Sequence, residues 1–142
     1  MIVLDTNVIS ALMRSTPDER VVNWLNAQPS ESIWTSSICV FEIMFGLQTM
    51  AKGKRRRALE DAFEKVLEQD LEGRVLDFDA TAAFEAAIIS AKLRSIGRSV
   101  EIRDVQIAGI VEARHGTLST RNTQHFVDTG IPLVNPWDDL PA

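Results

Sequence analysis

The chain has 142 residues, of which 45% are hydrophobic and 25% are charged, and its formal net charge is -5. These values are typical of one globular domain, so we expect a single domain over residues 1–142 and neither disorder nor a coiled coil. The net negative charge argues against binding of nucleic acid through an overall positive field. Only a local basic patch would serve that purpose.

The single cysteine, Cys39, lies in an apolar run, where it is typical of a small buried hydrophobe. One cysteine forms no internal disulfide, which agrees with a reducing cytoplasm. No basic leader precedes Asp5, and the longest apolar stretch, residues 38–47, is shorter than the ~20 residues that a membrane helix needs. We therefore expect a cytoplasmic protein that does not bind membranes.

The first half of the chain alternates apolar runs with amphipathic segments. In chain order we predict a strand at 1–4, a helix from 8 to 13, a helix capped by Thr16 and opened by Pro17, a strand at 33–35, a helix from 38 to 50 and a helix from 58 to 72. Residues 52–57, five of which are basic, are predicted to form the turn before the last helix.

The second half continues the same alternation. We predict a strand at 75–78, a helix over 82–96 capped by Asp79 or Thr81, a helix over 101–115, a strand at 117–120, a helical turn at 123–127 and a strand at 131–134. Strands separated by helices form a parallel sheet with right-handed crossovers. The expected fold class is therefore α/β, a three-layer α/β/α sandwich, in which the spacing leaves the strand order open.

Three carboxylates stand at unusual places in this pattern. Asp5 directly follows the first strand, at the carboxyl edge where open α/β sheets bind ligands. Glu42 projects from a mostly apolar helix surface, where an unpaired buried carboxylate is costly. Asp104 lies in the first turn of a later helix. Each also has an ordinary role, since Asp5 can cap a helix, Glu42 can reach solvent and Asp104 can complement a helix dipole.

Together these acids predict an oxygen-only site for Mg²⁺, with Mn²⁺ as an alternative. Such an ion commonly supports phosphodiester hydrolysis by an activated water. We expect Asp5 and Asp104 to be direct metal ligands and Glu42 to complete the site and orient or deprotonate the water. The supporting polar groups follow the first and fourth strands and would hold the carboxylates or the waters; they are Thr6, Asn7, Thr120 and Asn122.

Five motifs in order carry a resemblance over nearly the whole chain: MIVLDTNVIS, SSICVFEIMFGL, RDVQIAGIVEARHG, LSTRNTQHF and GIPLVNPW. With them the chain resembles PIN-domain ribonucleases of the VapC type, in the FitB-like branch. The resemblance implies a five-stranded parallel sheet, a homodimer and a Mg²⁺-dependent endoribonuclease. It also implies the toxin role in a type II toxin–antitoxin pair, with a cognate antitoxin that blocks the crevice.

The resemblance maps the central acids of the family onto Asp5, Glu42 and Asp104. Its fourth polar position falls in TRNTQHF, where Asn122 and His125 stand in place of acids that relatives often carry. The choice between one and two metal ions therefore stays open.

A basic cluster is the predicted contact for the RNA backbone, since cations bind phosphates without regard to sequence. It consists of Lys52, Lys54, Arg55, Arg56 and Arg57, and Arg121 near the fourth strand is a further candidate. The ordinary alternative for the cluster is a solvated helix start.

Two other functions stay open. A phosphoaspartate-type phosphatase would usually carry a second acid two residues after Asp5, where this chain has Asn7. An RNA-binding or regulatory module with weak catalysis would follow if the incomplete fourth position prevented metal binding. Three converging carboxylates argue against that module, because they repel phosphate unless a cation is bound.

Overall fold

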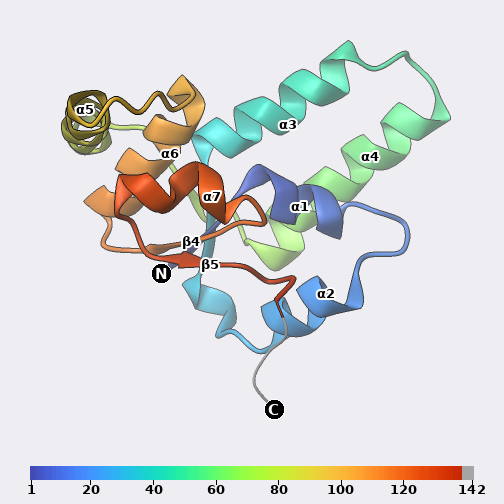
Figure 1. Cartoon of the computed structure of the whole chain (residues 1–142). Coiled ribbons are helices and arrows are strands. Elements are labelled where there is room, and N and C mark those ends of the chain that lie inside the picture. The colour runs from blue at the N-terminus through green and yellow to red at the C-terminus, as the bar shows by residue number, and fades with distance from the viewer. Residues whose placement is uncertain (139–142) are drawn as a thin grey trace.

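The computed structural model describes residues 1–138 and contains a sheet of five parallel strands in the order β3-β2-β1-β4-β5 (Figure 1). The strands are β1 (Ile2–Leu4), β2 (Ile33–Ser36), β3 (Val75–Leu76), β4 (Thr117–Ser119) and β5 (Leu133–Val134). In the register, Ile2 of β1 pairs with Ile33 on one side and Thr117 on the other. The predicted parallel α/β sheet is thereby confirmed, and all five strands occur within their predicted segments or one residue beyond.

In the described part of the chain, seven α-helices connect and cover the strands. They are α1 (Thr6–Leu12), α2 (Glu19–Asn26), α3 (Ser37–Thr49), α4 (Lys54–Lys65), α5 (Ala80–Ser95), α6 (Ile102–Ala113) and α7 (Thr123–Phe126). Helices α3, α5 and α6 lie above the sheet in Figure 1, and α2 lies below it. Within residues 1–138, none of these helices combines the length and the apolar character that a membrane crossing needs.

Four predicted helix starts differ from the structure by two residues or more. Helices α1 and α5 begin at Thr6 and Ala80, each two residues before its predicted start. Helix α2 begins at Glu19, not near Pro17, because the Asp18 carboxylate accepts a hydrogen bond from the Arg20 main-chain N–H at 2.9 Å and so caps the helix. Helix α4 begins at Lys54, so most of the predicted basic turn forms its first turn.

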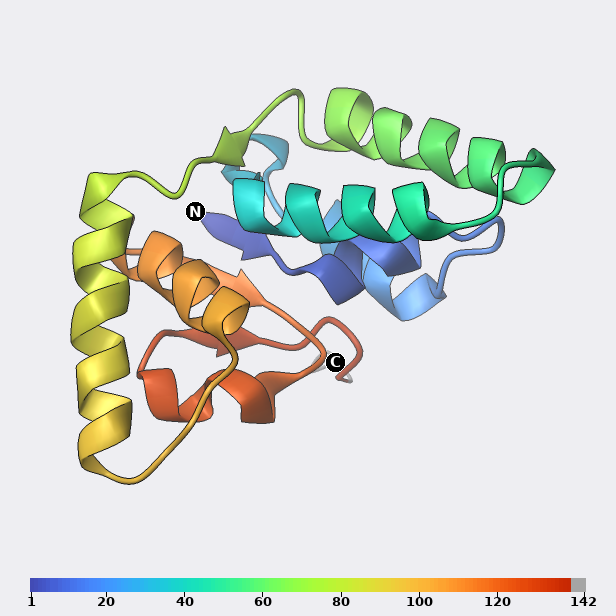
Figure 2. The ribbon, with the colours of Figure 1, turned by 90° about the horizontal axis from the view of Figure 1, so that it is seen from above.

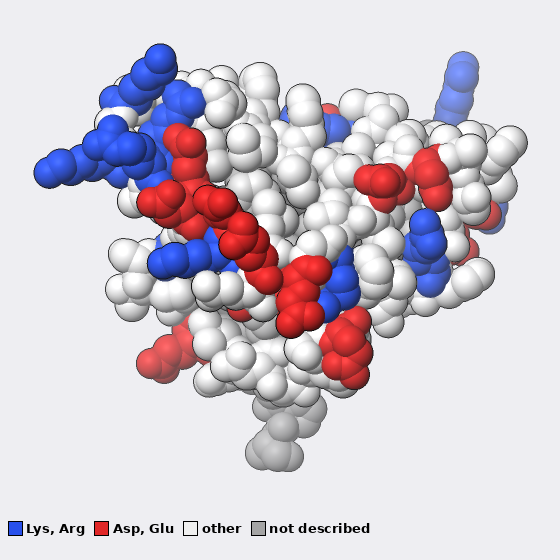
Figure 3. Space-filling view, turned by 180° about the vertical axis from the view of Figure 1, so that it is seen from behind, with Lys and Arg blue, Asp and Glu red and all other residues white. Residues whose placement is uncertain are grey.

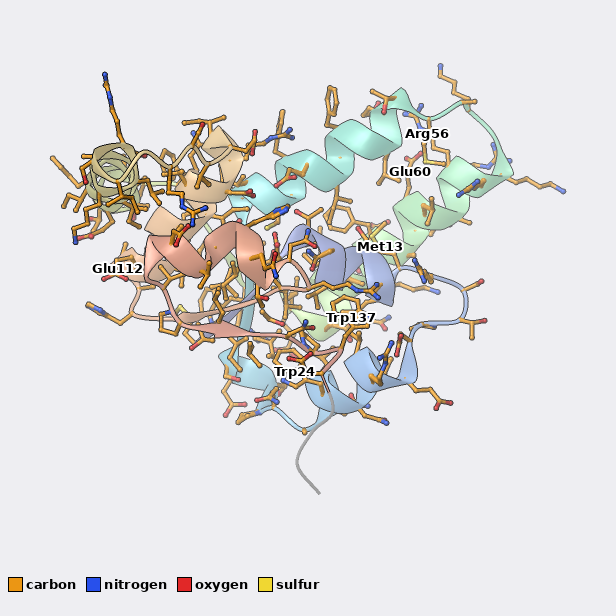
Figure 4. The ribbon with its side chains drawn as sticks, in the orientation of Figure 1. Met13, Trp24, Arg56, Glu60, Glu112 and Trp137 are labelled. Carbon is orange, nitrogen blue, oxygen red and sulfur yellow. The ribbon has the colours of Figure 1, made fainter. Side chains whose placement is uncertain are left out.

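The early start of α4 is stabilised by one of the basic residues themselves. The Arg56 guanidinium bonds the Glu60 carboxylate at 2.9 Å, one turn later, and reaches back to the Met50 carbonyl and the Gln48 side chain (Figure 4). These bonds connect the end of α3 to the start of α4. Helix α4 also stops being regular earlier than predicted, and residues Val66–Asp70 form a π-helix.

The core is centred on β1 and on α6, which packs against α5. Val3 and Leu4 of β1 are fully buried, as are Ile107, Ala108 and Val111 of α6. The close packing of α6 on α5 depends on Gly109, where an added Cβ would lie 2.5 Å from the Ala82 carbonyl oxygen and 2.7 Å from the Ala86 Cβ.

We predict that Gly109→Ala destabilises the fold by about 3 kcal/mol, because the two helices must separate to admit the methyl group. The matched control is Gly46→Ala in α3, where nothing lies within 4 Å of the added Cβ. That control should be stabilised by about 0.5 to 1 kcal/mol through helix propensity. Urea unfolding of both variants measures the difference, and equal stabilities would contradict the packing described.

Candidate active site

Asp5 lies where the sheet reverses its connection order, between β1 and β4, and its main-chain N–H donates to the Ser119 carbonyl at 2.9 Å. The Asp5 side chain is 6% exposed. Its carboxylate accepts hydrogen bonds from the Thr6 main-chain N–H at 2.8 Å and from the Thr120 hydroxyl at 2.7 Å. Asp5 therefore caps α1, which is the ordinary role that the sequence offered, and it also lines the crevice at this edge of the sheet.

Thr120 is the centre of a small hydrogen-bond network around Asp5. Its hydroxyl donates to the Asp5 carboxylate and accepts from the Asn7 side-chain amide at 3.3 Å and from the Asn122 main-chain N–H at 3.0 Å. The Asn7 amide also donates to Asp5 at 3.4 Å, and its oxygen accepts from the Arg121 main-chain N–H at 3.1 Å. The loops after β1 and β4 are thus joined through their polar side chains.

Thr6 takes part in this network through its main chain alone. Its hydroxyl oxygen is buried and has no hydrogen-bond partner among the described residues, although it lies beside Glu42 and Cys39. Cys39 itself is fully buried, and burial raises the pKa of its thiol to about 11. Cys39 therefore stays a protonated thiol at neutral pH, as expected for a small hydrophobe.

Glu42 of α3 and Asp104 of α6 line the same crevice of about 780 Å³ as Asp5. Burial raises the pKa of all three carboxyl groups, and the negative charge of Asp5 raises the pKa of Glu42 and Asp104 further. The start of α1, helix α3 and helix α6, which are distant in sequence, thus bring the three predicted acids close enough to repel one another.

Basic side chains lie close to these acids. The Arg103 guanidinium is 3.9 Å from the Glu42 carboxylate and 3.3 Å from Glu101, and His125 Nδ1 is 3.8 Å from the Asp104 carboxylate. Arg103 lowers the pKa of Glu42, although burial dominates and raises it. Arg103 therefore offsets part of the repulsion within the crevice.

Arg103, a cation that the sequence offered as a possible part of the crevice, does line it. The crevice also contains residues that the sequence did not single out, which are Ser10, Ala11, Arg14, Asp18, Glu101, Phe126 and Trp137. Trp137 follows β5, and the rule that ligands bind beyond the carboxyl ends of parallel strands would have indicated it, had the order of β4 and β5 been known. Arg14 and Asp18 lie in the segment after α1, and no pattern in the sequence indicated that this segment turns toward the crevice.

The basic cluster lies elsewhere, since Lys52, Lys54, Arg55, Arg56 and Arg57 are absent from the lining of the acidic crevice. Lys52, Lys54, Arg55 and Arg57 are exposed at the connection between α3 and α4, and acidic side chains run beside the cations at that corner (Figure 3). Arg56 is held by Glu60 instead.

The donor set fits a hard cation. Within residues 1–138 no three His, Cys, Asp or Glu side chains are arranged to hold one ion jointly. Mg²⁺ does not need three, because it is usually bound by one or two carboxylates and retains several waters. A buried carboxylate, two partly buried carboxylates that repel it and the unpartnered Thr6 hydroxyl form an oxygen-rich environment in which such an ion removes an electrostatic cost.

Fold and crevice together define an α/β protein with an acidic ligand site at the switch point of its sheet. The PIN domain family matches residues 2–131. The chain is 39% identical to the VapC ribonuclease Y4jK of Sinorhizobium fredii, over 97% of this chain and 99% of the relative. It is 34% identical to toxin FitB of Neisseria gonorrhoeae, over 98% of this chain and 100% of FitB.

A solved structure agrees with these relatives. The FitAB complex bound to a DNA fragment contains a chain that matches with a TM-score of 0.88 and 33% identity, over 99% of both chains. The chain therefore belongs to the PIN domain family, in its VapC-type group of ribonuclease toxins from type II toxin–antitoxin systems. The resemblance inferred from the five motifs is confirmed.

We predict that Asp104→Asn changes the pH dependence of stability in the presence of a chelator. Because the pKa of Asp104 is raised in the folded state, the folded protein binds this proton more tightly than the unfolded chain, and stability falls as pH rises through the raised pKa. The variant lacks this loss, so its stability relative to the wild type should increase as the pH rises above about 4, the ordinary pKa of an aspartate.

Urea unfolding at several pH values from about 4 upward is the measurement, repeated in a His125→Gln background that removes the neighbouring imidazole. Asp77→Asn, in the exposed loop between β3 and α5, is the matched control and should run parallel to the wild type. A relative loss of stability of Asp104→Asn on raising the pH would contradict the repulsion described.

Proposed function

We propose that the protein is a Mg²⁺-dependent endoribonuclease whose catalytic residues are Asp5, Glu42 and Asp104. The observation that carries this proposal is their meeting in one crevice with the pKa of each raised. The membership in the VapC-type ribonuclease toxins supplies the substrate class. We also propose that the whole chain forms a single PIN domain that acts in the cytoplasm.

Asp5 and Asp104 are the direct metal ligands in this proposal, with Glu42 at the edge of the site. When bound, Mg²⁺ polarises the phosphoryl oxygen and lowers the pKa of a coordinated water. Glu42 orients the attacking water and accepts its proton on a carboxylate oxygen, a role that its raised pKa favours. The water oxygen bonds to phosphorus as the bond between phosphorus and the leaving ester oxygen breaks, and that oxygen takes up a proton from solvent to leave as a hydroxyl group.

The supporting groups hold Asp5 in place. Thr120 and Asn7 fix its carboxylate through two hydrogen bonds, so it does not need to reorganise when charge develops. Asn122 brings a neutral amide to the position where relatives often carry an acid. This residue favours one metal ion over two, because a second divalent cation needs further anionic oxygen ligands.

Two groups of basic side chains would contact the RNA. Arg121 lies in the crevice itself. Lys52, Lys54, Arg55 and Arg57 lie at the start of α4 and would contact the backbone of a longer substrate, whereas Arg56 supports the helix.

A cognate antitoxin is the second proposed partner. Similar chains have been solved in toxin–antitoxin complexes, among them FitAB and VapBC2 from Rickettsia felis. A protein with an open acidic crevice needs such control, and we propose that the antitoxin covers the crevice and excludes RNA.

We also propose a homodimer, because large apolar side chains are exposed on three helices that lie on one side of the sheet (Figures 1 and 2). Phe41 and Phe45 of α3 stack on each other at 6.0 Å and are 57% and 58% exposed. Phe84 of α5 and Ile102 of α6 are exposed as well. Burial against a second copy would remove this apolar surface from water.

We predict that Asp104→Asn abolishes cleavage of a mixed cellular RNA pool, because it removes one of the two anionic metal ligands. EDTA should have the same effect on the wild type. The loss should be at least about a hundredfold, the scale expected when a metal ligand or its support is removed. Fragment analysis on a denaturing gel is the readout.

Asp77→Asn is the matched control and should cleave normally. Cleavage that survives both the chelator and Asp104→Asn would contradict the proposed mechanism. A folded protein that releases inorganic phosphate from a phosphomonoester without cutting RNA would favour the phosphatase alternative.

We predict that Phe45→Glu converts the dimer to a monomer, since a charge cannot be buried unpaired at an apolar contact. Light scattering after gel filtration is the measurement. Val127→Glu, at a residue that is 62% exposed and lies outside α3, α5 and α6, is the matched control and should stay dimeric. A wild-type protein that is monomeric at micromolar concentration would refute the homodimer.

A further inference from the structure

Arg121 is a cation in the crevice with no direct partner for its charge. Within residues 1–138 no carboxylate lies within ion-pair distance of its guanidinium, which also donates no hydrogen bond to the described residues. Asp18 is near enough for Arg121 to lower its pKa, but both Asp18 oxygens already accept bonds from Arg20 at 3.0 and 3.2 Å. The charge of Arg121 thus stays available to a ligand.

The guanidinium nevertheless has a defined position. Its Cζ lies 4.8 Å from the centre of the Trp137 ring, which is a cation–π contact. Trp137 is 8% exposed, and its main chain accepts a bond from Arg20 and donates one to Asn135. Figure 4 shows Trp137 on the side of the molecule that carries α1 and α2. The buried indole therefore holds the guanidinium carbon above its ring, while the N–H groups of the guanidinium have no hydrogen-bond acceptor among residues 1–138.

The main chain of Arg121 is connected to the catalytic carboxylate through one side chain. Its N–H donates to the Asn7 oxygen at 3.1 Å, while the Asn7 amide donates to Asp5 at 3.4 Å. Two hydrogen bonds thus fix the Arg121 backbone relative to Asp5. A ligand group on the guanidinium would be held at a set distance from the proposed reaction centre.

We propose that Arg121, held over the Trp137 ring, is a binding subsite for an RNA phosphate next to the one that is cleaved. A planar guanidinium with a free edge binds phosphate oxygens through two parallel hydrogen bonds, which an ammonium cannot do. The subsite offsets the repulsion between the acids and the RNA backbone at the crevice. This inference rests on the proposed ribonuclease function for its choice of ligand.

The test is binding of a fluorescein-labelled, mixed-sequence RNA 12-mer to the Asp104→Asn protein with Mg²⁺, followed by anisotropy at several salt concentrations. Adding Arg121→Ala should weaken binding about tenfold and reduce the slope of log K against log salt by ~0.7, the value for one phosphate on a single strand. Arg121→Lys should keep the slope and recover only part of the affinity. Lys92→Ala, an exposed cation on α5, is the matched control and should change neither quantity.

Equal binding with and without Arg121 would overturn the subsite. Full recovery of affinity by Arg121→Lys would also overturn it, because it would show that the planar guanidinium is not needed. Absence of RNA binding by the parent would also overturn it. Circular dichroism verifies that the variants fold. Cleavage by the wild type, measured alongside, separates the two proposals. Arg121-dependent binding without cleavage would remove the ribonuclease and retain the subsite, whereas cleavage with Arg121-independent binding would do the reverse.

Discussion

The site depends on keeping one carboxylate buried at the carboxyl ends of the neighbouring strands β1 and β4. Asp5 gains hydrogen bonds from Thr6 and Thr120, yet its pKa is raised because desolvation outweighs them. Those bonds hold the carboxylate in one orientation and tie the loop after β1 to the loop after β4. An acid that is fixed but still costly to ionise is one that a cation would stabilise. The architecture of the sheet and the chemistry of the crevice therefore have the same origin, which is the placement of β1 beside β4.

The other two acids increase this cost, and the chain offsets only part of it. Arg103 lies 3.9 Å from Glu42 and His125 lies 3.8 Å from Asp104, distances at which solvent weakens the attraction. Within residues 1–138 neither side chain lies within ion-pair distance of Asp5. A divalent ion would neutralise the negative charge of the three acids that Arg103 and His125 do not offset. We therefore expect the metal-free protein to be less stable than its packing alone would allow.

Much of this was predictable from sequence, for reasons that differ between residues. Asp5 directly follows β1 and Thr120 directly follows β4, and the carboxyl edge of a parallel sheet brings such residues together when their strands are neighbours. Glu42 was indicated by its apolar neighbours. The strand order was not predictable from spacing, and so Trp137 beyond β5 was missed. The starts of α2 and α4 were wrong because single side chains, Asp18 and Arg56, decide them through local hydrogen bonds.

The distribution of cations explains how a chain with a net charge of -5 can act on a polyanion. At the start of α4 the exposed cations lie beside acidic side chains. Charges act over only ~8 Å at physiological salt, and within that distance the acids weaken the positive field of the cations. In the crevice, Arg121 acts at contact distance and is held by an indole rather than by an acid. An aromatic partner positions a guanidinium without neutralising its charge, whereas a carboxylate partner would position it and neutralise its charge. Affinity for phosphate in such a protein therefore depends less on net charge than on which cations are held without an acid.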